Sequence, residues 1–285
     1  DRAISHLKRT LSPDAPAHTR AWSLNFLGKA HYQLGHLAAA DSTFRASRDM
    51  RATENSTKSS GRWMRVLGFD EMYNQWMRTN TDRFTLFGSP RVETSTDRLV
   101  ERYASAWNDL ATFFGGAPDR QVRLFVWASR EEAKQRGLTI GVAEPEYAVV
   151  HKEVSQTSGH ELAHVFEDRV LSPSHQAGLI SEGLAVYLDQ TGRDRLETAR
   201  QALGETGGQV SIQDWWKKNP EAWAQLSGRI RYPVAGAFVA YLAERGGRKT
   251  LLQLLRDQRL ERARTIYGAD TLSGWIASFE AKLKK

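Results

Sequence analysis

The pentapeptide His160-Glu161-Leu162-Ala163-His164 constrains this chain more than any other stretch. On a helix, histidines at this i, i+4 spacing lie on one face, one turn apart. Their imidazoles can then occupy two positions around a tetrahedral metal ion. Glu161 lies beside that ion without binding it, placed to take a proton from a metal-bound water. The motif predicts a helix that carries part of a zinc site, and the alternative is a pair of packed or capping histidines.

A second stretch supplies the missing ligand. A catalytic zinc ion takes three protein ligands and keeps one position open. Glu182 is the candidate for the third, because Pro173 and Gly178 end the first helix and a second helix is expected from 179 to 188. The small Gly183 permits close packing of the two helices beside a metal. The alternative for Glu182 is a surface carboxylate.

Composition excludes several classes of protein. The chain has 285 residues, of which 40% are hydrophobic and 10% aromatic, so it can bury a core and is not a disordered chain. It has no cysteine, which excludes disulfides, thiol catalysis and thiolate metal sites. No apolar run approaches the roughly 20 residues that a membrane span requires. The first residues show neither an initiator Met nor a signal-peptide pattern, so we expect a fragment or a processed form.

The chain is basic, with a formal net charge of +7 and a pI of about 9.7. Its positive residues are scattered among 33 acidic ones. That distribution favours an ordinary solvated surface and no nucleic-acid partner. The alternative is salt-sensitive binding to nucleic acid or to an anionic envelope polymer.

The first part of the chain is predicted to be helical. Two helices are expected between Ala21 and Ser47, separated at Gly35, because Leu and Ala residues recur there at helical spacing. The polar stretch 51–61 is predicted to be a linker and 63–77 an amphipathic helix. We therefore expect a helical segment with its linker over residues 1–58 and the main domain over 59–285.

The main domain is predicted to belong to the α+β class. Short apolar runs bounded by Gly or Pro predict strands, and longer periodic runs predict helices. The expected strands are 83–87, 121–127 and 148–150; the expected helices outside the site are 96–114, 212–218, 234–245, 250–256 and 272–283.

The N-terminal helical pair resembles a single tetratricopeptide repeat. The residues that carry the resemblance are Leu27, Gly28, Gly35, Ala40 and Phe44, whereas His31 departs from the usual aromatic. One repeat cannot bury its own face, so it should stack on the helix expected at 3–11 or on the main domain. The resemblance implies docking of a protein partner, and the alternative is a purely structural hairpin.

From about Arg83 to Leu283 the chain resembles gluzincin metallopeptidases of the peptidase MA-like branch. The resemblance rests on HELAHVF, on LISEGLAVY, on RYPVAGAF at 231–238 and on a closing helix with Trp275. It implies a zincin-like fold, with a mixed sheet over the HExxH helix, a helical lower lobe and a cleft between them. It also implies one Zn²⁺ ion on His160, His164 and Glu182, and hydrolysis of a peptide or protein substrate. The strand at 147–151 would pair with that peptide.

The resemblance assigns a further role and leaves gaps. Tyr232 is expected to donate its hydroxyl to the oxyanion of the tetrahedral intermediate, the alternative being a packing tyrosine. Thermolysin-like gluzincins carry an Asp that orients a metal-bound histidine, and Val186 occupies that position here. Another residue must therefore orient the histidine, and Asp189 is a candidate. Tyr187 is expected to pack, and His151 and His175 to be surface or loop residues and not site residues.

Two activities remain open at this stage. Aminopeptidases of the family that the chain resembles recognise the substrate amine with a Gly-x-Met-x-Asn-like motif. The chain lacks such a motif, which favours an endopeptidase over an aminopeptidase. The alternative is a non-catalytic zinc-containing binding or assembly protein that uses its helical repeat to dock a partner. The resemblance and the absence of cysteine favour an extracytoplasmic location, in the bacterial envelope or outside the cell.

Overall fold

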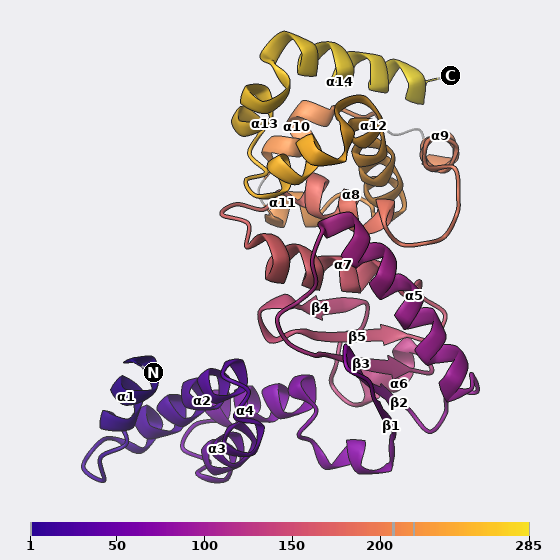
Figure 1. Cartoon of the computed structure of the whole chain (residues 1–285). Helices are drawn as coiled ribbons and strands as arrows, with labels where there is room; N and C mark the ends of the chain where they lie inside the picture. The colour runs from indigo at the N-terminus through magenta and orange to yellow at the C-terminus, as the bar shows by residue number, and fades with distance from the viewer. Residues whose placement is uncertain (1, 207–208, 219, 285) are drawn as a thin grey trace. The chain divides into compact units, whose positions relative to one another are not determined.

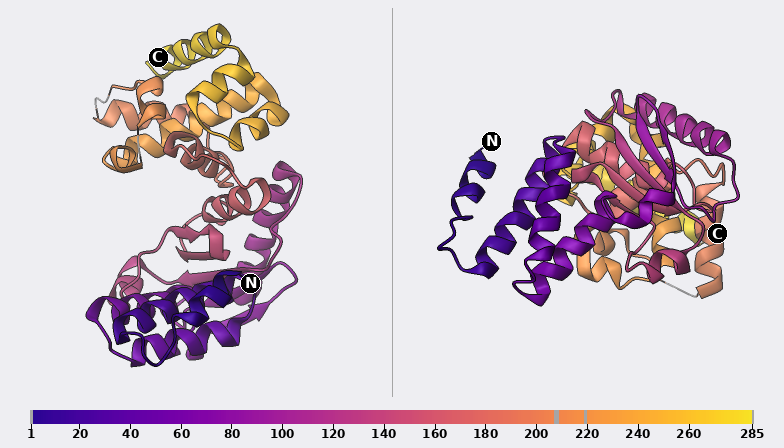
Figure 2. Two further views of the ribbon diagram at one scale, coloured as in Figure 1. Left: turned by 90° about the vertical axis from the view of Figure 1, so that its left-hand side faces the viewer. Right: turned by 90° about the horizontal axis from the view of Figure 1, so that it is seen from below.

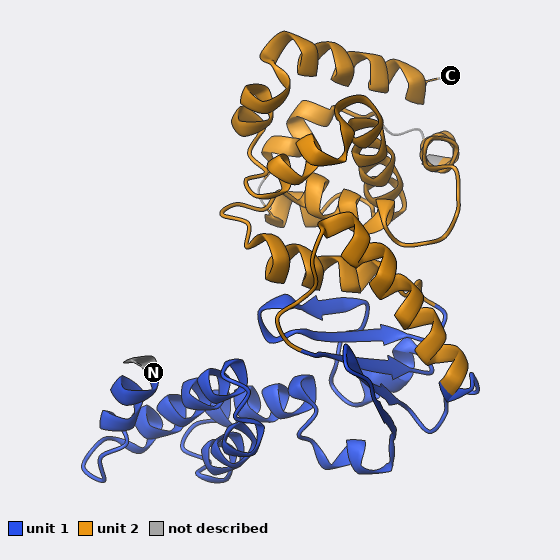
Figure 3. Cartoon of the chain, viewed as in Figure 1, with its two compact units in different colours: residues 1–96, 121–155 blue, residues 97–120, 156–285 orange. Residues whose placement is uncertain are grey.

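The computed structural model describes residues 2–206, 209–218 and 220–284 and shows a mixture of helices with one five-stranded mixed sheet (Figure 1). The chain divides into two compact units (Figure 3). Unit 1 comprises residues 1–96 and 121–155, and unit 2 comprises residues 97–120 and 156–285. None of the helices in the described residues is long and apolar enough to span a membrane.

The sheet lies in unit 1 and has the strand order β1-β2-β3-β5-β4. Its strands are β1 (Met77–Asn80), β2 (Phe84–Gly88), β3 (Val122–Trp127), β4 (Val142–Glu144) and β5 (Val149–Glu153). The strands β2, β3 and β5 run parallel, while β1 and β4 pair antiparallel at the two edges. Each residue of β2 is buried, as expected for a parallel strand covered on both faces. The three predicted strands are confirmed, whereas the two short edge strands were not predicted.

The other elements of unit 1 are mostly helical. They are α1 (Arg2–Arg9), α2 (Ala17–Gln33), α3 (Leu37–Asp49), α4 (Glu54–Leu67), η1 (Glu71–Gln75), α6 (Arg130–Gln135) and η2 (Pro145–Tyr147). The predicted hairpin is confirmed, since α2 and α3 lie side by side (Figure 2) and Gly35 separates them with φ of 79°. Gly28 permits their close approach, because an added Cβ would lie 2.9 Å from the ring of Phe44.

The predicted linker at 51–61 is wrong, because α4 occupies most of it. Thr53 caps this helix: its hydroxyl accepts from the Ser56 N–H, and the Ser56 hydroxyl accepts from the Thr53 N–H. The predicted helix at 63–77 is wrong as well, since α4 ends at Leu67 and Gly68 follows with φ of 77°. The expected boundary between residues 58 and 59 therefore falls inside a helix.

One aromatic core joins the hairpin to the sheet within unit 1. It includes Tyr32 and Phe44 of the hairpin together with Phe87, Phe125 and Trp127 of the sheet. Phe87 and Phe125 stack with ring centroids 4.5 Å apart. The hairpin thus buries one face against other parts of unit 1.

Unit 2 is helical in its described residues. Its elements are α5 (Thr96–Phe114), α7 (His160–Phe166), the π-helix η3 (Glu167–Leu171), α8 (Gly178–Tyr187), α9 (Arg195–Thr206), α10 (Ile212–Lys217), α11 (Pro220–Ala224), α12 (Gly228–Leu255), α13 (Leu260–Tyr267) and α14 (Ala269–Leu283). The long α12 is interrupted at Gly247, which has φ of 76° and ψ of 158°, so it contains both helices predicted at 234–245 and 250–256. The helices α9, α11 and α13 were not predicted at these positions.

Glycines bring the helices of unit 2 close to one another. A Cβ added at Gly183 of α8 would lie 2.5 Å from the carbonyl oxygen of Ala235 in α12. A Cβ added at Gly159, just before α7, would lie 2.5 Å from the carbonyl oxygen of Leu188 at the end of α8. Both distances are shorter than any van der Waals contact, so only glycine fits at either position. The body of α8 is thereby packed closely on α12, and the start of α7 lies close to the end of α8.

Candidate metal centre

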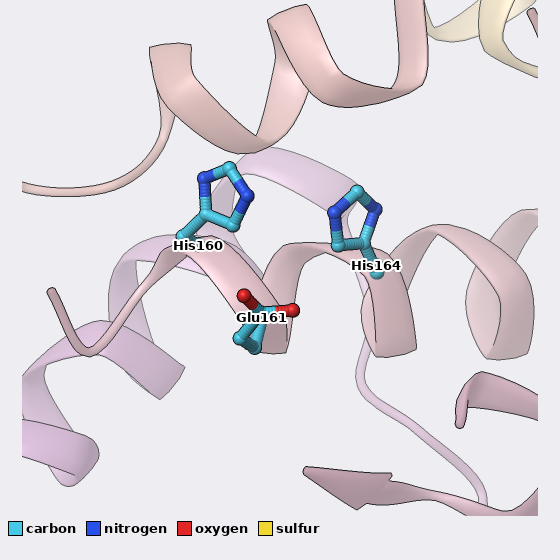
Figure 4. Close-up of side chains that lie close together, drawn as sticks. All are labelled: His160, Glu161 and His164. Atoms are coloured by element: carbon cyan, nitrogen blue, oxygen red, sulfur yellow. The ribbon is translucent and has the colours of Figure 1, made fainter. Parts of the chain in front are cut away.

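The helix α7 presents its two histidines on one side. Figure 4 shows the imidazoles of His160 and His164 on the same face of the helix, with the Glu161 carboxylate on a different side. The apolar residues Leu162, Ala163, Val165 and Phe166 are all buried. Phe166 packs on Trp107 of α5 with ring centroids 4.9 Å apart. Burial of the apolar face leaves the histidine side chains partly exposed, at 22% and 16%.

Glu182 of α8 lies opposite this histidine face. Its Oε2 atom is 3.5 Å from Nε2 of His160 and also 3.5 Å from Nε2 of His164. In a tetrahedral site with metal–ligand bonds of about 2.0–2.1 Å, ligand atoms are roughly 3.3–3.4 Å apart. One ligand atom from each of His160, Glu161 and His164 also lies within 4.8 Å of the others. These residues therefore fit a divalent metal ion.

Two candidate ligand sets follow, one with Glu182 and one with Glu161, and both contain His160 and His164. Both imidazoles direct Nε2 toward a single oxygen of Glu182, at 3.5 Å each. Glu161 is only 6% exposed and projects from the same helix as the histidines. His160, His164 and Glu182 therefore form one candidate ligand set, with Glu161 as the neighbouring carboxylate.

The charges of the site depend on each other. Burial by itself raises the pKa of Glu182, but hydrogen bonds with His160 and His164 outweigh it and hold that pKa well below its usual range. Burial likewise lowers the pKa of His164, but the hydrogen bond with Glu182 and the charges of nearby carboxylates raise it to about 9. In the metal-free chain a proton thus balances the Glu182 charge. A cation at the same place would displace that proton.

Tyr232 lies against the metal-ligand set. Its ring meets that of His160 edge-on, with centroids 6.2 Å apart. Arg231 donates from Nη2 to the Tyr232 hydroxyl oxygen at 3.0 Å and from Nη1 to the Trp223 carbonyl oxygen at 2.8 Å. Tyr232 lies inside α12, not before a helix as predicted, because α12 begins at Gly228. Because the hydroxyl oxygen accepts from Arg231, its own proton can be donated elsewhere.

Val186 and Asp189, which were expected near the metal ligands, make other contacts. Val186 packs against α12, where a Cβ added at Gly236 would lie 2.3 Å from Val186 Cγ1. The Asp189 carboxylate accepts from Arg195 Nη2 at 2.6 Å and from the Thr191 N–H at 2.9 Å. The suggestion that Asp189 orients a metal-bound histidine is therefore wrong for His164, whose Nδ1 lies next to Ser181.

The remaining candidates are structural. Tyr187 packs on Phe113, with ring centroids 6.1 Å apart, as predicted. His175 is exposed in a loop, also as predicted. His151 is a core residue and not a surface one: it is 1% exposed, accepts at Nδ1 from Trp127 Nε1 at 3.2 Å and bonds Val66 O through Nε2 at 2.8 Å.

The strand predicted to bind a peptide is paired on both sides. Residues 149–151 of β5 pair with β3 on one side and with β4 on the other. Their backbone groups are therefore engaged within the sheet, and the expectation that 147–151 adds a substrate strand is wrong. The edge next to β5 is formed by β4.

Three residues near the site were missed by the sequence argument: Glu167, Ser181 and Gln258. Ser181 Oγ lies 3.5 Å from His164 Nδ1 and donates to Glu167 Oε2 at 2.7 Å. Gln258 Nε2 donates to Glu167 Oε1. Two sequence features could have pointed to this group: Glu167 follows His164 at i+3 spacing, and Ser181 directly precedes Glu182.

Comparison of the chain with protein-family models and with curated proteins found no match. The resemblances to gluzincins and to tetratricopeptide repeats therefore stay hypotheses based on motifs. The function has to be argued from the chemistry of the site.

Proposed function

We propose that this chain is a zinc-dependent peptidase of the gluzincin type, acting as an endopeptidase. The observation that carries the proposal is the placement of two imidazole Nε2 atoms 3.5 Å from one Glu182 oxygen. Two nitrogens and one carboxylate oxygen form a ligand set typical of catalytic zinc, which keeps one coordination position open. The mixed sheet in unit 1 and the helical unit 2 are compatible with a zincin-like fold.

Each residue has a distinct part in hydrolysis. When bound, zinc supplies Lewis-acid polarisation of the scissile carbonyl and lowers the pKa of water. Glu161 takes a proton from the attacking water and passes it to the leaving amine. Tyr232 donates its hydroxyl proton toward the carbonyl oxygen as negative charge develops there, and Arg231 holds the Tyr232 oxygen at 3.0 Å.

The burial of Glu161 suits this role. The Glu161 side chain is only 6% exposed, so the surrounding side chains restrict its position. Glu161 also follows the ligand His160 directly in the helix, which fixes it relative to the ligand set.

The test is Glu161→Gln, assayed by digestion of a peptide library with and without chelator. The substitution keeps the size and shape of the side chain but removes the base, so we expect zinc content to stay and hydrolysis to fall about 10²- to 10⁴-fold. Glu244→Gln, at an exposed position of α12, is the matched control and should leave hydrolysis unchanged. Wild-type activity in Glu161→Gln would contradict the assignment.

The second candidate function is a binding or assembly protein. The observation that favours it is a set of exposed apolar side chains on the hairpin: Phe26 is 50% exposed, Leu34 48% and Leu37 41%. A protein partner could cover these side chains. A wild-type chain that retains zinc but cleaves no peptide of the library would support this function.

A further inference from the structure

We propose that Glu167 is a positioning residue of the metal centre, acting on His164 through Ser181. The inference rests on the proposed function, since it takes His164 as a metal ligand. It assigns the task that Asp performs in thermolysin-like relatives to residues at other positions.

The side-chain amide of Gln258 has a defined orientation. Its Oε1 accepts from the Ala177 N–H at 2.8 Å, so the atom facing Glu167 must be the Nε2 donor. Its backbone is held as well, because its N–H donates to His175 O at 3.0 Å and its carbonyl accepts from Trp216 Nε1 at 2.7 Å. Gln258 is completely buried. It is therefore a fixed donor to Glu167 Oε1.

The other oxygen of Glu167 receives the Ser181 hydroxyl. Ser181 has one hydroxyl proton, and the 2.7 Å contact with Glu167 Oε2 uses it. The lone pairs of Ser181 Oγ are then left for His164 Nδ1, 3.5 Å away. That arrangement places the proton of a neutral His164 on Nδ1 and the lone pair on Nε2. Nε2 is the atom that faces Glu182.

This tautomer is the one a metal ligand needs. A metal at Nε2 increases the positive charge on the imidazole, which makes its Nδ1–H a stronger donor toward Ser181. Glu167 in turn accepts the hydroxyl proton of Ser181, which leaves the Ser181 lone pairs facing His164. The order of donors is His164 to Ser181 to Glu167, with Gln258 donating to Glu167 from the far side.

The position of Glu167 supports a role at the centre. It is 0% exposed, and burying a carboxylate is costly unless donors surround it. Its donors come from α8, from Gln258 in the segment before α13 and from Gln176, at 3.4 Å. It begins the π-helix η3 that follows α7, and short π-helical segments are frequent at functional sites.

The test uses Ser181, because Ser181→Ala breaks the chain of donors and leaves Glu167 and Gln258 in place. Zinc affinity is measured by competition with a chromophoric chelator, and the absorption of the cobalt-loaded protein is recorded. Loss of an outer-shell partner weakens metal binding about 10- to 100-fold, so we expect that loss for Ser181→Ala together with a shifted cobalt spectrum. Ser181→Thr keeps the hydroxyl and should restore affinity to within about threefold.

Two controls separate positioning from folding. Ser273→Ala, at an exposed position of α14, should change neither affinity nor spectrum. Urea unfolding of the metal-free variants checks that Ser181→Ala and Ser181→Thr are both folded under the conditions of the zinc measurement. Glu167→Gln should weaken zinc binding in the same direction as Ser181→Ala.

The outcomes are distinguishable. If Ser181→Ala binds zinc within about threefold of wild type, or if the Thr variant is as weak as the Ala variant, the positioning role is overturned while the proposed function stands. If the wild-type chain itself takes up no zinc, the proposed function fails first and the positioning role fails with it.

Discussion

The charge of the Glu182 carboxylate suits the binding of a cation. Its carboxylate is partly buried, which alone would favour the neutral acid, yet both histidines direct a nitrogen toward it and its pKa is low. In the absence of metal, a proton on His164 balances the negative charge of Glu182. A divalent ion would replace the proton and satisfy all three groups at once.

His151 gives a prediction about pH that does not involve the metal. Burial lowers the pKa of His151 to about 4, even though the hydrogen bond to Val66 O raises it. The folded state therefore holds this imidazole neutral, whereas the unfolded chain protonates it below about pH 6.5. The stabilisation is complete above pH 6.5 and is lost as the pH falls toward 4, by up to about 3 kcal/mol.

Urea unfolding at pH 7.5 and pH 4.5 measures this effect. His151→Gln should be less stable than wild type at pH 7.5 but should lose less stability on acidification. His18→Gln, at an exposed position, should show the wild-type pH dependence. An equal loss in wild type and His151→Gln would contradict the account.

The residues of the site were only partly predictable. HExxH spacing and the following Glu-Gly indicated His160, His164 and Glu182, and the structure places their atoms together. Glu167 was not predicted, because its donor Gln258 lies 91 residues further along the chain. Local spacing contains no information about which buried groups meet across such a separation.

Among the elements, α8 carries Glu182 and packs closely on α12, and this contact depends on small residues. Gly236→Ala would place a Cβ 2.3 Å from Val186 Cγ1, so it should destabilise the fold by about 1–3 kcal/mol. Adding Val186→Ala removes the 2.3 Å contact with Cγ1 and leaves the 2.8 Å contact with Cβ, so the double variant should lose less than the sum of the single variants.

Gly274→Ala in α14 is the matched control. A Cβ there meets no atom within 4 Å, so the substitution should be neutral or add up to about 1 kcal/mol through helix propensity. The free energy of unfolding in urea compares the variants. A Gly236→Ala variant as stable as Gly274→Ala would show that this packing does not hold α8.

Some elements were predictable and others were not. The strand β3 was found because its residues form a continuous apolar run, typical of a buried parallel strand. The helix α4 was missed because its first half is rich in Ser, Thr and Asn, which have low helix propensity. Packing overrides that preference: Ser60 donates to Ser47 Oγ at 2.7 Å and accepts from Asn25 Nδ2 at 2.9 Å.

At the scale of the whole molecule, chain order and spatial grouping differ. Residues 97–120 belong to unit 2, although they connect β2 and β3 of unit 1. The N-terminal hairpin shares its core with the sheet, so it is not an appendage joined by a linker. A sequence pattern reports the local period of apolar residues, and it cannot show which faces meet.

The central claim is that His160, His164 and Glu182 together hold one zinc ion. Elemental analysis of the purified chain, after incubation with zinc and removal of the free metal, tests it most directly. We predict about one zinc per chain in wild type and in Glu161→Gln, and little or none in Glu182→Gln and His160→Ala. A wild-type chain without zinc, or a Glu182→Gln variant that retains as much zinc as wild type, would contradict the account.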